Sequence, residues 1–197
     1  MTALIKARDP SDYAIRSVRR ASEAAILAPH GGKIESGTTE IAEAIAGDDY
    51  NFYTFEGRMS RDNFKILHVT STHYDEKVCN DLINECTYVV AVHGLRDREG
   101  HERKDETICL GGKDTILRNA VMRALQANNF DFEQEEGKEG KSSQNICNCG
   151  KAKQGVQIEI RRTLRDALVP NSSERGPKFP IFVKAVRDAI ALVIKGH

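Results

Sequence analysis

Two histidines and one glutamate lie where strands of a buried sheet would bring them to a common edge. His30 follows the apolar run Ala24–Ala28 after a single proline, and Glu35 comes five residues later. His93 directly follows a second apolar run, Tyr88–Val92. Short apolar runs of this kind indicate buried strands, and ligands gather at the carboxyl ends of strands in open α/β sheets. We therefore expect the three side chains to meet.

Two imidazoles and one carboxylate form a ligand set that catalytic zinc sites use, with a further position left open for water. The residue types thus predict a metal site made by His30, Glu35 and His93. The alternative is that the two histidines are unrelated loop residues. His73 is the first rival ligand, because it also lies just past the end of an expected strand.

Two other histidines are interpreted as structural or solvated residues. His68 falls inside an expected strand, Phe64–Ser71, where a histidine is more often a hydrogen-bonded core residue than a ligand. His101 lies in the highly charged segment 96–106, which is expected to be an exposed loop.

A hydrolytic metal site also needs a general base that takes a proton from water, and Glu159 is the candidate. It lies in the expected strand Gly155–Ile160, whose alternation puts Gln157 and Glu159 on one face and apolar side chains on the other. Burying an unpaired carboxylate is costly. Glu159 therefore either acts at a site or pairs with an arginine, and the sequence leaves both interpretations open.

The elements that must position these residues alternate between strand and helix. Strands are expected at 13–20, 24–28, 50–55, 64–71, 88–92, 107–110, 130–132 and 155–160, and helices at about 39–46, 78–86, 115–128, 163–169 and 182–195. This alternation predicts an α/β fold with a mixed, largely parallel sheet and helices on both faces. Residues 13–20 are expected to form a hairpin with the strand that leads to His30, and residues 133–143 a mobile polar loop.

Bulk properties exclude several classes of protein. A chain of 197 residues is expected to form a single domain over residues 1–197. Its 29 basic and 29 acidic residues cancel, so it is not a general binder of polyanions such as nucleic acid. We find no apolar run long enough for a membrane span and no signal peptide at the N-terminus. The sequence therefore predicts a protein made in the cytoplasm, with no membrane partner.

Beyond these patterns, the chain resembles the poly-γ-glutamate hydrolases of phages and Bacillus. The resemblance runs from about residue 24 to residue 166 and rests on the segments APHGGKIESGTTEIAEAIAG, YTFEG, LHVTSTHYDE, VVAVHG, GGKD, NICNCG and GVQIEIRRTLR. The family is similar in fold to the zinc carboxypeptidases. The resemblance implies one zinc ion per chain, held by His30, Glu35 and His93, with Glu159 as the general base.

The resemblance also implies a substrate, the γ-linked amide of poly-γ-glutamate, which is a capsule or slime polymer. Because each unit of this polymer carries a free α-carboxylate, we expect a local basic patch that binds it. Arg165, Arg161 and Lys33 are the candidates, and the family pattern favours Arg165. Arg161, Arg162 and Arg165 are the candidates for steadying the oxyanion. The enzyme is expected to be a monomer that reaches its substrate outside the cell, after lysis.

Two other functions remain open. The same zinc scaffold could cleave another amide, in a peptide or an acylated amino acid. Alternatively, the chain could be a non-enzymatic module with a structural zinc ion, in which case the coordination shell would be closed.

Overall fold

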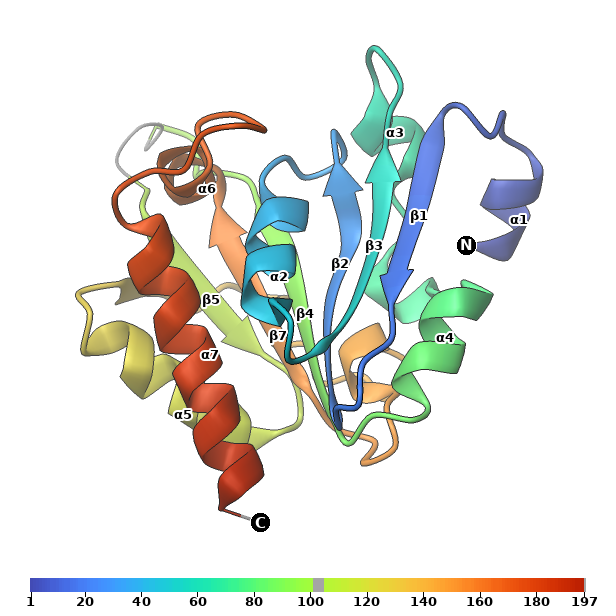
Figure 1. Cartoon of the computed structure of the whole chain (residues 1–197). Helices are drawn as coiled ribbons and strands as arrows, with labels where there is room; N and C mark the ends of the chain where they lie inside the picture. The colour runs from blue at the N-terminus through green and yellow to red at the C-terminus, as the bar shows by residue number, and fades with distance from the viewer. Residues whose placement is uncertain (101–104, 197) are drawn as a thin grey trace.

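The computed structural model describes residues 1–100 and 105–196, so His101 lies outside the described residues. In these ranges, strands of one sheet run in the order β1-β3-β2-β4-β7-β5-β6 (Figure 1). The strands are β1 (Tyr13–Val18), β2 (Ala24–Gly32), β3 (Asn51–Gly57), β4 (Tyr88–Leu95), β5 (Thr107–Gly111), β6 (Asp131–Phe132) and β7 (Val156–Arg161).

The helices are distributed along the whole chain. The α-helices are α1 (Thr2–Lys6), α2 (Thr38–Ala46), α3 (Asn63–Leu67), α4 (Lys77–Ile83), α5 (Thr115–Gln126), α6 (Arg162–Leu168) and α7 (Phe179–Lys195). Two short 3₁₀ turns, η1 (Ser71–His73) and η2 (Ile146–Asn148), complete the set described. None of the helices described is both long and apolar enough to cross a membrane.

The centre of the sheet is parallel. Strands β3, β2, β4 and β7 are parallel neighbours, whereas β1 is antiparallel to β3 and β5 is antiparallel to β7. The expected mixed, largely parallel sheet is thus confirmed. From β2 the chain passes through α2 to β3 on one side, and β4 later joins on the other side. The strand order therefore reverses between β2 and β4, which is where open α/β sheets bind ligands.

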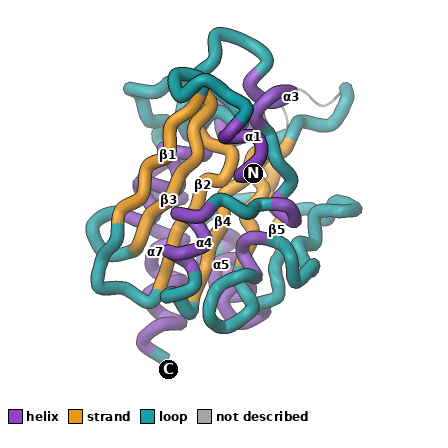
Figure 2. The backbone as a smooth tube through the Cα atoms, turned by 90° about the vertical axis from the view of Figure 1, so that its right-hand side faces the viewer, coloured by secondary structure: helices purple, strands orange, loops and turns teal. Residues whose placement is uncertain are grey.

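Helices cover both faces of the sheet, as predicted. On one face α2, α5 and α7 pack on a core that includes Ile26, Val90 and Ile158. The opposite face carries a second core, in which Leu27 and Ala91 pack against residues of α3, α4 and η2. Figure 2 shows α1 and α4 on one side of the strands and α7 on the other. Because both faces of the central strands are covered, their sequences are nearly continuous apolar runs.

Two expectations about the first third of the chain are wrong. Residues 64–71 do not form a strand, because residues 63–67 form the single helical turn α3 and the chain then bends through η1. Residues 13–18 do form an edge strand, but its partner is β3 and not β2. Both edges of β2 are already occupied by the parallel strands β3 and β4, so β2 has no edge left for a hairpin.

Candidate metal and catalytic site

An irregularity in β2 aims His30 at the site. Between Ala28 and Gly31 the register of β2 against β3 shifts, so that β2 carries one residue more than its partner. Such bulges re-aim side chains next to active sites. The extra residue turns the His30 ring toward the face of the second core, where it lies 5.0 Å from the His93 ring and 6.3 Å from the Tyr74 ring, between centroids.

Three donor side chains converge at this point. His30 Nδ1 lies 3.2 Å from His93 Nδ1 and 3.3 Å from Glu35 Oε1. His93 Nδ1 is also 3.8 Å from Glu35 Oε2, and one donor atom from each of the three residues lies within 4.8 Å of the others. All three side chains are buried. The three residues expected to meet from their places in the sequence are therefore brought together.

The outer nitrogen of each imidazole is bonded to the stretch that follows α3, which leads into η1. His30 Nε2 donates to the carbonyl oxygen of Val69 at 2.7 Å, so Nε2 carries a ring proton and Nδ1 is the nitrogen that faces the cluster. His93 Nε2 lies 3.4 Å from Ser71 Oγ. Metal-binding histidines are oriented by bonds of this kind on the far side of the ring. Glu35 is oriented similarly, because the amide of Gly94 donates to its Oε2 at 2.7 Å.

The charges in this cluster favour a bound cation. Burial alone would raise the pKa of Glu35, but His30 and His93 lower it to about 2. Burial and the neighbouring His30 together lower the pKa of His93 to about 3. The pKa of His30 is raised despite burial, because the Glu35 carboxylate favours a proton there. An ionised carboxylate and a neutral imidazole are the forms that bind a metal, and a cation can replace the proton held at His30.

Glu159 lies beside this cluster on the next strand. It is the register partner of His93 in the parallel pair β4–β7, and its side chain faces the second core. Gln157 Nε2 donates to Glu159 Oε1 at 2.9 Å, and Asn145 Nδ2 donates to Gln157 Oε1 at 2.8 Å. Burial raises the pKa of Glu159. A buried carboxylate with a raised pKa, held in one orientation beside a cation site, is suited to accept a proton.

The basic residues expected near substrate have different environments. A cleft of about 580 Å³ adjoins Glu35 and Gly94, and Lys33 and Arg165 both line it. Three other cations share this lining: Arg61, Arg96 and Arg162. Arg165 is nevertheless buried, and its guanidinium donates to three carbonyl oxygens, those of Ser36, Leu95 and Ile160.

Arg161 and Arg162 are engaged in ion pairs. Arg161 is buried and pairs with Asp105, Glu133 and Glu135, away from the 580 Å³ cleft. Arg162 lies at the surface, where its Nε donates to both carboxylate oxygens of Asp166. Arg162 thus pairs with an acidic neighbour on its own helix, α6.

Two residues near the site were not identified from the sequence. His68, expected in the core, packs against the ring of His30 at 4.1 Å between centroids, with the two rings tilted by 37°, and has its Nε2 3.7 Å from Glu35 Oε1. The two histidines of the segment HVTSTH, residues 68–73, could have indicated a nearby site. Because residues 64–71 were expected to form a strand, His68 was instead assigned to the core. Lys138 reaches Glu159 from a polar loop in which no local pattern distinguishes one lysine from its neighbours. His73, the rival ligand, instead lies 3.0 Å from Thr70 through its Nδ1.

Comparison with known proteins gives this geometry a context. The chain is 32% identical over 182 residues to the UPF0714 protein YmaC of Bacillus subtilis (strain 168), covering 90% of this chain and 74% of YmaC. It is 34% identical over 163 residues to YndL of the same strain, covering 81% of this chain and 62% of YndL.

Solved structures match the fold over nearly the whole chain. A bacteriophage poly-gamma-glutamate hydrolase superposes with a TM-score of 0.91 at 27% identity, covering 100% of this chain and 97% of that one. The zinc-free apo form of YndL superposes with a TM-score of 0.88 at 29% identity, covering 97% and 95%. A putative carboxypeptidase from Burkholderia mallei shares the fold at a TM-score of 0.51 and 12% identity, with coverage of 94% and 60%.

The carboxypeptidase-like fold expected from the resemblance is thus confirmed. The model of the poly-gamma-glutamate hydrolase family matches residues 1–179. This match spans most of the chain and includes each of the converging donor residues and Glu159. The chain belongs to the poly-gamma-glutamate hydrolase family.

Proposed function

We propose that this protein is a zinc-dependent hydrolase that cleaves the γ-glutamyl amide bonds of poly-γ-glutamate. The observation that carries the proposal is the convergence of His30, Glu35 and His93 beside Glu159, in a chain of this family. The zinc-free apo form of the related YndL supports zinc as the metal.

The donor set fits a zinc ion. Two imidazole nitrogens with free lone pairs and one ionised carboxylate are ordinary ligands of catalytic zinc, and His30 Nδ1, His93 Nδ1 and Glu35 supply them here. When bound there, zinc would lower the pKa of a water molecule and polarise the scissile carbonyl. The remaining steps belong to side chains of this protein.

Glu159 acts as the general base in the proposed mechanism. It takes a proton from the attacking water and later passes that proton to the amine that leaves. The bond from Gln157 holds one carboxylate oxygen, so the other oxygen is available for the proton. Burial of Glu159 supports this role, because its raised pKa makes the carboxylate a better proton acceptor.

The basic cleft supports an anionic substrate. The lining contains four exposed cations: Lys33, Arg61, Arg96 and Arg162. A fifth cation of the lining, Arg165, is buried. Of the acidic groups in the lining, Asp97 is occupied, because it accepts hydrogen bonds from the amide and hydroxyl of Thr163. We propose that α-carboxylates of the polymer next to the scissile amide bind here, with Lys33 contacting them and Arg165 adding positive charge from the wall of the cleft. Arg161, which was also a candidate, is neutralised by its acidic partners and is not part of this proposal.

We further propose that the protein works as a monomer on polymer outside the cell and reaches it through lysis. The likeness to a bacteriophage hydrolase supports this setting.

The experiment that tests the function combines two measurements on the purified protein. Metal content is measured first, and the viscosity of a poly-γ-glutamate solution is then followed with the zinc-loaded and the chelator-treated protein. We expect one zinc ion per chain and a viscosity loss that requires zinc. Zinc binding without cleavage of any amide would favour a binding module, whereas cleavage of acylated amino acids but not of polymer would favour the other amidohydrolase activity.

A further inference from the structure

The arginines considered for steadying the oxyanion are bonded elsewhere. Arg165 is committed to three carbonyl oxygens, Arg161 to an acidic cluster, and Arg162 to Asp166. A different cation reaches the proposed base. Lys138 Nζ lies 3.5 Å from Glu159 Oε1, and the Lys138 side chain is 35% exposed whereas that of Glu159 is 6% exposed. The ammonium group therefore lies on the solvent side of Glu159, where substrate must arrive.

The segment that carries Lys138 is anchored along its length, and we call residues 133–142 the strap. Its first part is held by Arg161, which pairs with Glu133 and Glu135. Its middle is held by the amide of Gly112, which donates to the carbonyl oxygen of Glu139 at 2.9 Å. At its end, Asn148 Nδ2 donates to the carbonyl oxygens of Gly140 and Ser142. The strap has no regular secondary structure, as predicted for this polar loop, but these bonds tie it to β7, to the turn after β5 and to η2.

Glycines let the strap pass close to the sheet. A Cβ atom on Gly111 would come within 2.7 Å of the carbonyl oxygens of Lys138 and Glu139. Gly140 has a φ of 59°, which favours glycine. The Lys138 backbone is thus fixed directly over β5, and the antiparallel pairing of β5 with β7 sets it beside Glu159.

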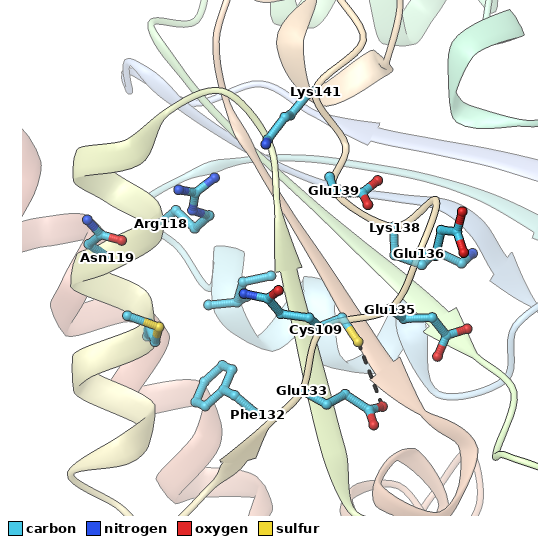
Figure 3. Close-up of a pocket in the computed structure, with 13 residues that line it drawn as sticks. Cys109, Arg118, Asn119, Phe132, Glu133, Glu135, Glu136, Lys138, Glu139 and Lys141 are labelled. Atoms are coloured by element: carbon cyan, nitrogen blue, oxygen red, sulfur yellow. Dashed lines mark hydrogen bonds between the residues drawn. The ribbon is translucent and has the colours of Figure 1, made fainter.

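Lys138 also lines a second groove, which shares no lining residue with the basic cleft. This groove, of about 800 Å³, is lined by the strap, by Cys109 on β5 and by residues of α5 such as Arg118 (Figure 3). Cys109 is the register partner of Glu159. Lys138 therefore lines this groove and also reaches Glu159, which is not itself among the residues that line the groove.

We infer that Lys138 is a further catalytic residue, whose ammonium group donates a hydrogen bond to the carbonyl oxygen of the scissile amide as that oxygen gains negative charge. This inference rests on the proposed function. Lys138 stays protonated throughout: the carbon–nitrogen bond breaks, a bond from carbon to the water oxygen forms, and the proton moves from water through Glu159 to the leaving amine. A donor fixed where charge develops is worth about 10²–10³-fold in turnover.

The contacts of Lys138 favour this role over a purely structural one. Its separation from Glu159 is long for a charge-assisted hydrogen bond, so the ammonium can turn to a substrate oxygen without a large loss. Anchoring of the strap also does not depend on the Lys138 side chain, because the bonds described above involve other side chains and backbone groups. Replacing the side chain should therefore leave the strap in place.

The test compares Lys138→Met, Lys138→Arg and the control Lys141→Met, which removes a lysine that lines the same groove. We expect Lys138→Met to keep its zinc and its thermal midpoint, to lower kcat by about 10²–10³-fold and to change KM little. Lys138→Arg should recover part of kcat, and Lys141→Met should resemble the parent. A Lys138→Met protein with the kcat of the parent, or one that loses zinc, would overturn the inference.

A second measurement separates a catalytic role from a structural one. A phosphinate analogue of γ-glutamylglutamate carries a charged oxygen at the position of the carbonyl oxygen, and its affinity can be measured by calorimetry. Lys138→Met should weaken this binding by about the same factor as kcat/KM, as expected for a group that acts on the transition state. Binding of uncleaved substrate to a Glu159→Gln protein should not change when Lys138→Met is added.

Equal losses for both ligands would identify Lys138 as a structural residue and overturn the inference. The comparison also distinguishes the two levels of proposal. A parent protein that cleaves no polyglutamate contradicts the proposed function, whereas an active parent with an equally active Lys138→Met variant contradicts the role of Lys138 alone.

Discussion

At the scale of single residues, the hydrogen bond on the outer side of His30 determines which nitrogen is left for a cation. Because a carbonyl oxygen only accepts, the contact with Val69 places the proton on Nε2. Nδ1 is then the nitrogen directed toward His93 and Glu35, where a cation could replace a proton. In the proposed metal site, Val69 would therefore orient a ligand without itself binding the metal, which is common in metalloproteins.

The ligand assignment predicts a linked loss of zinc and activity. His30→Ala and His93→Ala should each remove most of the bound zinc and most of the turnover, because two ligands from the chain hold a metal far less well than three. His73→Ala serves as the control and should keep both, since His73 bonds Thr70 away from the cluster. Metal content is measured by elemental analysis. If His30→Ala retained one zinc ion per chain, the assignment would be wrong, and His68 would be the next ligand to test.

The base is tested by a change that preserves its shape. Glu159→Gln can still accept the bond from Gln157 but cannot take a proton. We expect zinc to be retained and kcat to fall by at least the roughly 10²–10⁴-fold typical of a lost acid–base group. Stopped assays of polymer cleavage, together with zinc content, check this result. Near-normal turnover would remove Glu159 from the mechanism, and loss of zinc would make it a ligand.

Local sequence was informative about the residues that strands deliver. His30, Glu35 and His93 could be predicted because each lies within a few residues of an apolar run, and parallel neighbours end at the same edge. His68 and Lys138 could not. Each reaches the site from a segment whose course depends on distant contacts, as when Arg161 draws the strap onto β7.

At the scale of elements, the Arg161 cluster joins the strap to the sheet. Burial alone would raise the pKa values of Asp105 and Glu133. Arg98 and Arg161 nevertheless lower the pKa of Asp105. Arg161 and Thr107 likewise lower the pKa of Glu133. A carboxylate with a lowered pKa in the folded state stabilises the protein above its unfolded pKa, near 4. That contribution is lost as the pH falls through the folded-state value.

This linkage predicts how Arg161→Met changes stability. Near neutral pH the variant should lose about 3 kcal/mol of unfolding free energy, the low end for breaking a buried ion pair, because Glu135 remains partly exposed. The difference from the parent should persist down to about pH 4 and shrink below it, as the pH falls through the lowered folded-state pKa values of the carboxylates. Thermal unfolding followed by circular dichroism at several pH values measures it.

Lys77→Met is the control, since it breaks an exposed pair with Asp81 and should cost under about 1 kcal/mol at any of these pH values. An Arg161→Met protein whose deficit stayed constant down to pH 3 would show that the ionised carboxylates of this cluster contribute no stability.

Sequence patterns predicted the elements better than their partners. The central strands and the long helices were predicted because buried runs and helical periodicity are local signals. The strand prediction for residues 64–71 was wrong because their alternation of apolar and polar residues resembles that of a strand. In the structure, the side chain of Asn63 bonds both the amide and the carbonyl of Met59, and the helical turn α3 begins at Asn63. The partner of β1 was wrong for a different reason, since strand pairing is decided by which edges the whole sheet leaves free.

At the scale of the whole molecule, a chain with no net charge has to attract a polyanion through the arrangement of its charges. The basic cleft provides such an arrangement beside the proposed metal site. Arg96 is exposed in its lining and lies with its guanidinium carbon 5.0 Å from the centroid of the Phe64 ring. An arginine supported in this way can bind a carboxylate through both oxygens.

The basic cleft predicts a binding defect that depends on salt. Arg96→Gln and Lys33→Gln should each raise KM for poly-γ-glutamate several-fold at low ionic strength, leave zinc content unchanged and lower kcat little. Arg165→Ala is a poorer test of substrate binding, because its three bonded carbonyl oxygens would lose their donor and the fold itself would suffer. Lys184→Gln, on the exposed face of α7, is the matched control for loss of one charge.

The decisive measurement is KM against salt concentration for the parent and these variants. Screening weakens attraction between exposed charges, with a Debye length that falls from about 30 Å at 0.01 M to about 10 Å at 0.1 M. The KM of the parent should therefore rise with salt, and the curves of Arg96→Gln and Lys33→Gln should start higher and rise less steeply, meeting that of the parent at high salt. The Lys184→Gln curve should follow the parent, because that charge lies away from the cleft. If both cleft variants followed the parent at every salt concentration, the polymer would bind elsewhere, and the groove beside Lys138 would be the next surface to examine.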